Sequence, residues 1–152
     1  MKNVSRQGLA IVAFACVAAT LAPAQATTAA RVNAVMPKPL TALPGDATRG
    51  RDIALDKNVG GCVLCHALPG ADGVVAEPHG TLGPSLTDVG ARLNTAQLRQ
   101  RIVDPTRIDR RAAMPAYFRS AGLQRVAPGY RGKTLLTAQQ VEDVISYLVG
   151  LR

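Results

Sequence analysis

Two cysteines and a histidine stand close together in the segment Cys62-Val63-Leu64-Cys65-His66. This Cys-x-x-Cys-His order is typical of covalent haem attachment, in which two thiols add to the two vinyl groups of a porphyrin. The histidine after the second cysteine then lies under the ring, where its imidazole reaches the iron. The motif therefore predicts one covalently bound haem c, held by Cys62 and Cys65, with His66 as an axial ligand of the iron.

Other interpretations of this motif fit the sequence less well. A redox-active Cys-x-x-Cys is expected among alternating strands and helices, and no such pattern surrounds the motif. A structural zinc site needs four ligands, but outside the motif the sequence offers His79, Cys16 and a thin set of carboxylates. A disulfide between cysteines so close together is uncommon. Because the carboxylates are dispersed, we expect no catalytic nucleophile or acid–base set on this chain.

A second axial ligand is expected from Met114, which precedes Pro115 in a loop. Thioether ligation favours reduced iron and raises the reduction potential, which suits an electron acceptor. Two alternatives remain open: Met114 fills a gap in the core, or His79, between a proline and a glycine, binds the iron instead. Met36 is a weaker candidate because it lies near the N-terminus.

The N-terminus has the features of a secretory signal peptide. Lys2 and Arg6 precede an apolar run from Gly8 to Ala22, and Ala24-Gln25-Ala26 is a small-x-small cleavage pattern. The run is too short for a membrane span. We therefore predict cleavage after Ala26 and a periplasmic protein, because haem c is attached outside the bacterial inner membrane. Cys16, inside the run, leaves a lipid anchor as an alternative.

The mature chain is basic. Without Lys2 and Arg6, 16 basic residues remain against 10 acidic ones, a net charge of +6. Nucleic acid is a poor partner for an exported chain with few aromatic residues, so a basic face would suit an acidic protein. We expect scattered, solvated charges rather than one patch for the basic residues of the middle loop, Arg107, Arg110, Arg111 and Arg119.

The chain divides into a signal peptide (1–26), an arm rich in Pro and Ala (27–44) and one domain (45–152). The arm is expected to be extended and to become ordered on a partner. In the domain, Asp46 predicts the start of a helix over about 47–57. A second helix begins at Asn94 or Thr95 and ends before Pro105.

The last helix is the clearest element of the sequence. Thr137 and Gln140 form a capping box, and apolar residues follow at the spacing of one helix face, at Val141, Val144, Ile145, Leu148 and Val149. The stretches 67–90 and 106–133 read as loops around the haem. The sequence therefore predicts a small all-α fold with few helices and long haem-wrapping loops.

In this order of elements the chain resembles the class I cytochrome c family. The shared features are the first helix, the Cys-x-x-Cys-His motif, Gly83-Pro84-Ser85-Leu86, Met114-Pro115 and the terminal helix. In that family the proline of Gly-Pro-x-Leu turns its carbonyl toward the proximal histidine, which implies that Pro84 orients His66. Gly50 and Tyr147 resemble the small and aromatic residues at the crossing of the first and last helices.

More narrowly, the chain resembles SoxX, the monohaem cytochrome family of the sulfur-oxidising (Sox) system. The similar stretches are 45–56, 61–66, 102–105, Met114-Pro115-Ala116-Tyr117 and 136–148. One departure is Gly61, where the family often has Asn. The resemblance implies a heterodimer with a SoxA-like haem subunit and a soluble cytochrome c as electron acceptor. The complex would oxidatively couple thiosulfate to a cysteine of the carrier SoxYZ, which this chain would meet only indirectly.

By this resemblance, the chain would be the electron-transfer subunit of an L-cysteine S-thiosulfotransferase-type complex. Its mature form would have no free thiol once Cys62 and Cys65 carry haem, so the sulfur chemistry would belong to the partner. Two alternatives of another class stay open. One is a free-standing soluble electron shuttle, and the other is a haem peroxidase or gas sensor with an open sixth position.

Overall fold

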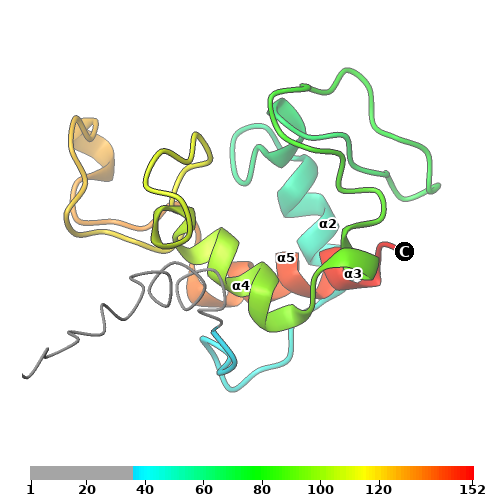
Figure 1. Cartoon of the computed structure of the whole chain (residues 1–152), viewed down its shortest axis with the longest axis horizontal. Coiled ribbons are helices and arrows are strands. Elements are labelled where there is room, and N and C mark those ends of the chain that lie inside the picture. The colour runs from blue at the N-terminus through cyan, green and yellow to red at the C-terminus, as the bar shows by residue number, and fades with distance from the viewer. Residues whose placement is uncertain (1–35) are drawn as a thin grey trace, which may run out of the picture.

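A computed structural model describes residues 36–152, in which four α-helices and three 3-10 turns are joined by long loops (Figure 1). The helices are α2 (Ala47–Leu55), α3 (Val89–Arg92), α4 (Thr95–Val103) and α5 (Ala138–Gly150). The turns are η1 (Cys62–Leu64), η2 (Pro105–Arg107) and η3 (Pro128–Tyr130). The described residues form no strand, and the predicted all-α class is confirmed.

The predicted signal peptide, Cys16 and residues 27–35 of the predicted arm lie outside the described residues. Within residues 36–152, none of the helices has the length and apolar character that crossing a membrane requires.

Helix starts follow local capping chemistry. The Asp46 side chain accepts a hydrogen bond from the Arg49 amide, and Thr137 forms the predicted capping box with Gln140. A second capping box at the start of α4, between Asn94 and Gln97, was not predicted. The first helix is shorter than predicted, since it ends at Leu55, and the four-residue α3 was not predicted at all.

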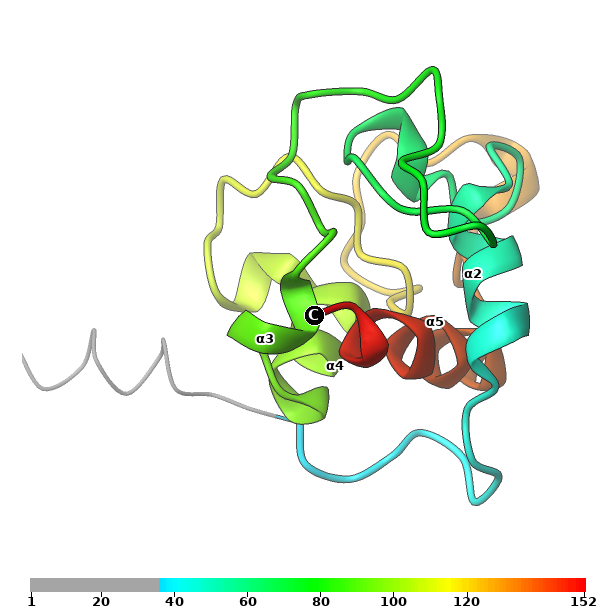
Figure 2. The same cartoon turned by 90° about the vertical axis from the view of Figure 1, so that its right-hand side faces the viewer.

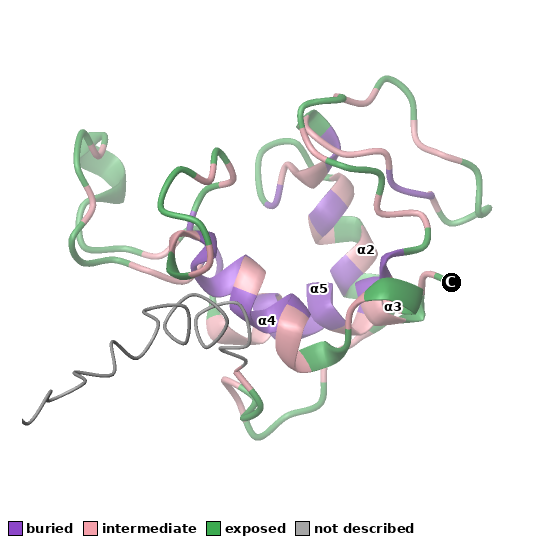
Figure 3. Ribbon diagram, in the orientation of Figure 1, coloured by how far each residue is buried: buried purple, intermediate pink, exposed green. Residues whose placement is uncertain are grey.

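Helix α5 is the centre of the core, because α2, α3 and α4 all pack against it (Figures 1 and 2). Its buried apolar residues recur at helical spacing, and the purple stretches of Figure 3 run along α4 and α5. Gly50 lies where α2 crosses α5: a Cβ at this position would come within 1.9 Å of the Asp143 carbonyl oxygen. The close helix crossing expected at Gly50 is therefore present.

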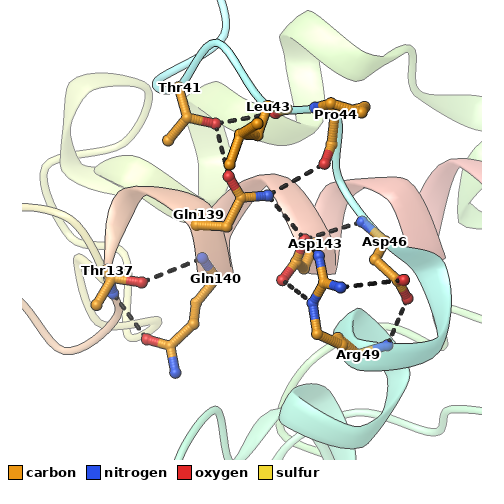
Figure 4. A network of polar contacts seen from close by, with 9 residues as sticks. All are labelled: Thr41, Leu43, Pro44, Asp46, Arg49, Thr137, Gln139, Gln140 and Asp143. Carbon is orange, nitrogen blue, oxygen red and sulfur yellow. Dashed lines mark hydrogen bonds and ion pairs between the residues drawn. The ribbon is translucent and has the colours of Figure 1, made fainter.

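The start of α2 is fixed to α5 by the buried carboxylate of Asp143 (Figure 4). This carboxylate accepts hydrogen bonds from Arg49 Nε (3.0 Å), the Asp46 amide (2.8 Å) and Gln139 Nε2 (3.0 Å). Burial would raise the pKa of Asp143, but these donors outweigh it and the pKa lies below its ordinary value. The charged form is therefore part of the helix contact.

The described end of the predicted arm, residues 36–44, is extended but lies along its own domain. Arg99 of α4 donates to the Met36 carbonyl oxygen (2.6 Å), and the Leu40 amide donates to Glu142 Oε1 of α5 (2.9 Å). Thr41 Oγ1 adds a 2.9 Å hydrogen bond to Gln139 Oε1. Contacts within the chain therefore order this part of the arm.

Two long segments leave the helices on the same side, which is the upper side in Figures 1 and 2. Residues 56–88 carry the Cys-x-x-Cys-His motif, and residues 104–136 carry Met114. The hydroxyl of the buried Tyr147 on α5 hydrogen-bonds to the Pro69 carbonyl oxygen and so anchors the first segment to the core.

Candidate haem site

The two motif cysteines lie at the two ends of one tight turn: Cys62 begins η1, and Cys65 is its C-terminal cap. The N-terminal cap is Gly61, whose φ of +60° is in the left-handed region. The amides of Cys65 and His66 both donate to the Cys62 carbonyl oxygen, at 3.1 and 2.9 Å. Glycine and asparagine are the residues that adopt this backbone region most readily. The departure at Gly61 from the Asn common in SoxX therefore keeps the same turn.

The imidazole of His66 is held by Pro84. His66 Nδ1 lies 2.6 Å from the Pro84 carbonyl oxygen, which can only accept, so Nδ1 carries the proton of this hydrogen bond. The other ring nitrogen, Nε2, keeps a lone pair suitable for a metal. The contact implied by the family resemblance is thus present, while its role toward iron stays a prediction.

Backbone hydrogen bonds bring Pro84 to this position. The Gly83 amide donates to the Cys65 carbonyl oxygen (2.8 Å), and the Leu86 amide donates to that of Ala67 (3.0 Å). A Cβ on Gly83 would lie 2.1 Å from Cε1 of His66. Because no side chain fits there, glycine at this position lets the loop press against the imidazole face.

The two thiols differ in environment. In the described chain they are not joined in a disulfide. Burial raises the pKa of the Cys62 thiol to about 11, and its Sγ lies 3.8 Å from the Gly60 carbonyl oxygen. Cys65 is half-buried. The Cys62 thiol is therefore protonated at neutral pH, and neither cysteine is tied up in a disulfide.

The residues present fit a covalently held haem. Two free thiols, an imidazole with a fixed orientation and a glycine against its ring lie in one segment. Beside them, Leu64 is 54% and Leu82 is 76% exposed, an apolar surface of the kind that a porphyrin covers. His79 is kept in its own loop, where Nδ1 lies 3.2 Å from the Ala76 carbonyl oxygen.

Met114 comes from the second segment and is half-buried against the core. Its loop is closed at the base by an ion pair of 2.9 Å between Arg119 and the buried Asp104. Thr106 also donates to Asp104, through its hydroxyl (2.6 Å) and its amide (3.1 Å). Burial raises the pKa of Asp104, but these donors outweigh it, so the net shift is downward and the carboxylate stays charged.

Tyr117, three residues after Met114, joins the two segments. Its hydroxyl donates to the carbonyl oxygen of Gly60 (2.7 Å), two residues before Cys62. Burial, followed by the neighbouring Cys62, raises the pKa of Tyr117. Sequence reasoning assigned no role to Tyr117 or to the Asp104–Arg119 pair. The tyrosine was visible only as part of the Met-Pro-Ala-Tyr stretch shared with SoxX.

Comparison with known proteins identifies the family to which this fold belongs. A model of the family "Cytochrome c" matches residues 47–152. The crystal structure of SoxXA from P. pantotrophus is similar, with a TM-score of 0.66 and 36% sequence identity, covering 75% of this chain and 87% of that chain. No curated protein sequence matched. Members of this family bind haem c covalently and transfer electrons, and this chain belongs to the cytochrome c family as a SoxX-like class I cytochrome c.

Proposed function

We propose that this chain is a periplasmic monohaem cytochrome that serves as the SoxX subunit of a SoxAX complex in thiosulfate oxidation. The observation that carries the proposal is the His66 imidazole, fixed by Pro84 beside two free thiols, in a chain similar to one in SoxXA. Cys62 and Cys65 would hold one haem c, and His66 and Met114 would bind its iron from the two segments.

Each of these residues has a separate task in electron transfer. Cys62 and Cys65 would hold the haem through two thioether bonds, each made by adding S–H across a vinyl group, which needs no oxidant. The Pro84 carbonyl holds the proton on Nδ1 and directs Nε2 of His66 to the metal. The Met114 thioether would favour the reduced state of the bound iron. When bound, the haem supplies a one-electron iron couple.

Sulfur chemistry is assigned to the partner. Coupling thiosulfate to a thiol forms a sulfur–sulfur bond and releases one proton and two electrons. After residue 26 this chain has no cysteine besides Cys62 and Cys65, so with haem attached it offers no thiol for that bond. It would take the two electrons singly from a SoxA-like haem subunit and pass them to a soluble cytochrome c.

Two other functions make different predictions. A free-standing electron shuttle would exchange electrons rapidly without a partner subunit. A haem peroxidase or gas sensor would have an open sixth position and would bind carbon monoxide in the untreated reduced protein. Met114, in a loop fixed at its base by Asp104 and Arg119, favours a closed site over the second of these.

Co-expression with a SoxA-like haem chain should give a heterodimer that stays together in gel filtration.

A variant lacking residues 27–35 tests the arm, because deleting 36–44 as well would remove contacts to α4 and α5 within the domain. We expect full-length protein to co-elute with the partner and the shortened variant to bind it more weakly. Strictly monomeric behaviour of the full-length protein with that partner would contradict the SoxX assignment.

The charge of the domain is concentrated in residues 105–133, which we term the cationic segment. This segment has seven basic residues and one acidic residue, whereas the other described residues have eight basic and nine acidic ones. Arg119 and Lys133 line a hollow beside Met114, and Arg125 and Arg131 line another. The two hollows adjoin, since they share Leu123 and Val126.

The expectation that Arg107, Arg110, Arg111 and Arg119 do not form one patch stays a prediction. Arg119 is joined at the hollows by three later basic residues, and not by Arg107, Arg110 or Arg111. The cationic segment therefore supports docking of an acidic electron acceptor near the Met114 loop.

Replacing Arg131 and Lys133 with glutamine should slow electron transfer to an acidic soluble cytochrome c by about tenfold at low ionic strength. The effect should vanish near 1 M salt, where the Debye length is about 3 Å. Stopped-flow kinetics would measure it. Lys38→Gln with Arg152→Gln removes the same charge outside the segment and should have little effect. Equal slowing by both pairs would mean that net charge, not this surface, controls the rate.

A further inference from the structure

Tyr117 is fixed at several points between the two halves of the site. Its ring is buried, and its hydroxyl donates to the Gly60 carbonyl oxygen at 2.7 Å. Its amide donates to the Ile102 carbonyl oxygen at the end of α4, and its carbonyl accepts from the Leu136 amide, both at 3.0 Å. The backbone of the Met114 loop and the phenol ring are therefore held as one unit.

The Tyr117 hydroxyl directly connects the two segments that carry the site. Within residues 36–152, it forms the one hydrogen bond that directly joins segment 56–88 to segment 104–136. Gly60 is itself held against the end of α2. Its amide donates to the Ile53 carbonyl oxygen (3.1 Å), and a Cβ on Gly60 would meet that same oxygen at 2.4 Å. The phenol therefore ties the Met114 loop to a rigid part of the haem-attachment side.

Haem attachment makes this tie more important. The Gly60 carbonyl oxygen lies near two side-chain donors, the Tyr117 hydroxyl and the Cys62 thiol, whose Sγ is 3.8 Å away. Once the Cys62 sulfur is bonded to a vinyl carbon, its hydrogen is gone and it no longer donates. Tyr117 then remains as the side-chain donor to this carbonyl, and a buried carbonyl without a donor is costly.

We infer that Tyr117 is a positioning residue that keeps Met114 on the haem iron by holding the Met114 loop against the attachment segment. The inference rests on the proposed ligation of iron by Met114. It assigns to the phenol hydroxyl a role in the strength of the sixth ligand, separate from its contribution to folding. Its loss should raise the fraction of molecules in which the thioether has left the iron.

The test is imidazole binding to the oxidised holoprotein, which requires displacement of the methionine. Tyr117→Phe should bind imidazole about tenfold more tightly than the parent, because the fraction of molecules whose iron has lost the thioether rises. Titration followed by the long-wavelength methionine–iron absorption band measures this directly. Tyr147→Phe is the matched control, since it also removes a buried tyrosine hydroxyl bonded to a carbonyl oxygen, that of Pro69.

A purely structural role would affect the two variants alike. We expect both to unfold at lower denaturant concentration, and only Tyr117→Phe to bind imidazole more tightly. Parent-like imidazole affinity in Tyr117→Phe, or an equal gain in Tyr147→Phe, would overturn the inference while leaving methionine ligation intact. A band that persists in Met114→Ala would instead refute the ligation and the inference together.

Discussion

Replacing Met114 with alanine is expected to abolish the long-wavelength methionine–iron absorption band of the oxidised protein. The reduction potential should fall by roughly 0.2 V, within the range of about 0.8 V that axial ligands set. The physical reason is that a thioether favours reduced iron, and the methyl of alanine cannot replace it. Optical spectroscopy and a potentiometric titration would measure both effects. The open position should also bind carbon monoxide, which the parent should not do.

Met36→Ala provides the matched control. Met36 is also partly buried against the core, but it belongs to the extended segment before α2, where Arg99 holds its carbonyl oxygen. This variant should lose some stability and keep the absorption band and the potential. An intact band in Met114→Ala would show that another group binds the iron. Loss of the band in Met36→Ala would point to the methionine that sequence reasoning ranked lower.

The two halves of the site differ in how far the sequence predicts them. The attachment side is local: Cys62, Cys65 and His66 occupy one turn, and Pro84 returns through a few backbone hydrogen bonds. The order of residues in the sequence therefore predicts most of the geometry of the attachment side. The Met114 side depends on distant contacts, such as Tyr117 with Gly60, which are 57 residues apart. No spacing rule brings such residues together.

The same distinction holds for the fold. The caps at Asp46 and Thr137 could be predicted because each involves residues three positions apart. Helix α3 has four residues, too few to show periodicity. The packing of residues 36–44 was hidden because the partners of this segment, Arg99 and Glu142, lie far along the chain. Charge patterns alone do not reveal which ion pair becomes buried.

Glu142→Gln is expected to lower the free energy of unfolding by about 3–5 kcal/mol, because it leaves the Arg99 charge buried without its partner. The side chains of this pair are 3% and 7% exposed, and the guanidinium contacts both carboxylate oxygens, at 2.7 and 2.8 Å. Domains of this kind are stable by only about 5–15 kcal/mol. Guanidinium chloride unfolding would measure the loss. Limited proteolysis should show cleavage within residues 36–44, since Leu40 and Met36 are held by the same pair.

A variant that lacks both charges tests whether the unpaired charge of Arg99 causes the loss of stability. The double variant Arg99→Met, Glu142→Leu should be more stable than Glu142→Gln, because no unpaired charge stays buried. Recovery should be incomplete, since the Met36 carbonyl and the Leu40 amide lose their partners, at about 1–3 kcal/mol each if they stay buried. Asp88→Asn breaks the exposed pair with Arg92 and should change stability by less than about 1 kcal/mol. A double variant less stable than Glu142→Gln would mean that the unpaired charge of Arg99 is not what destabilises the single variant.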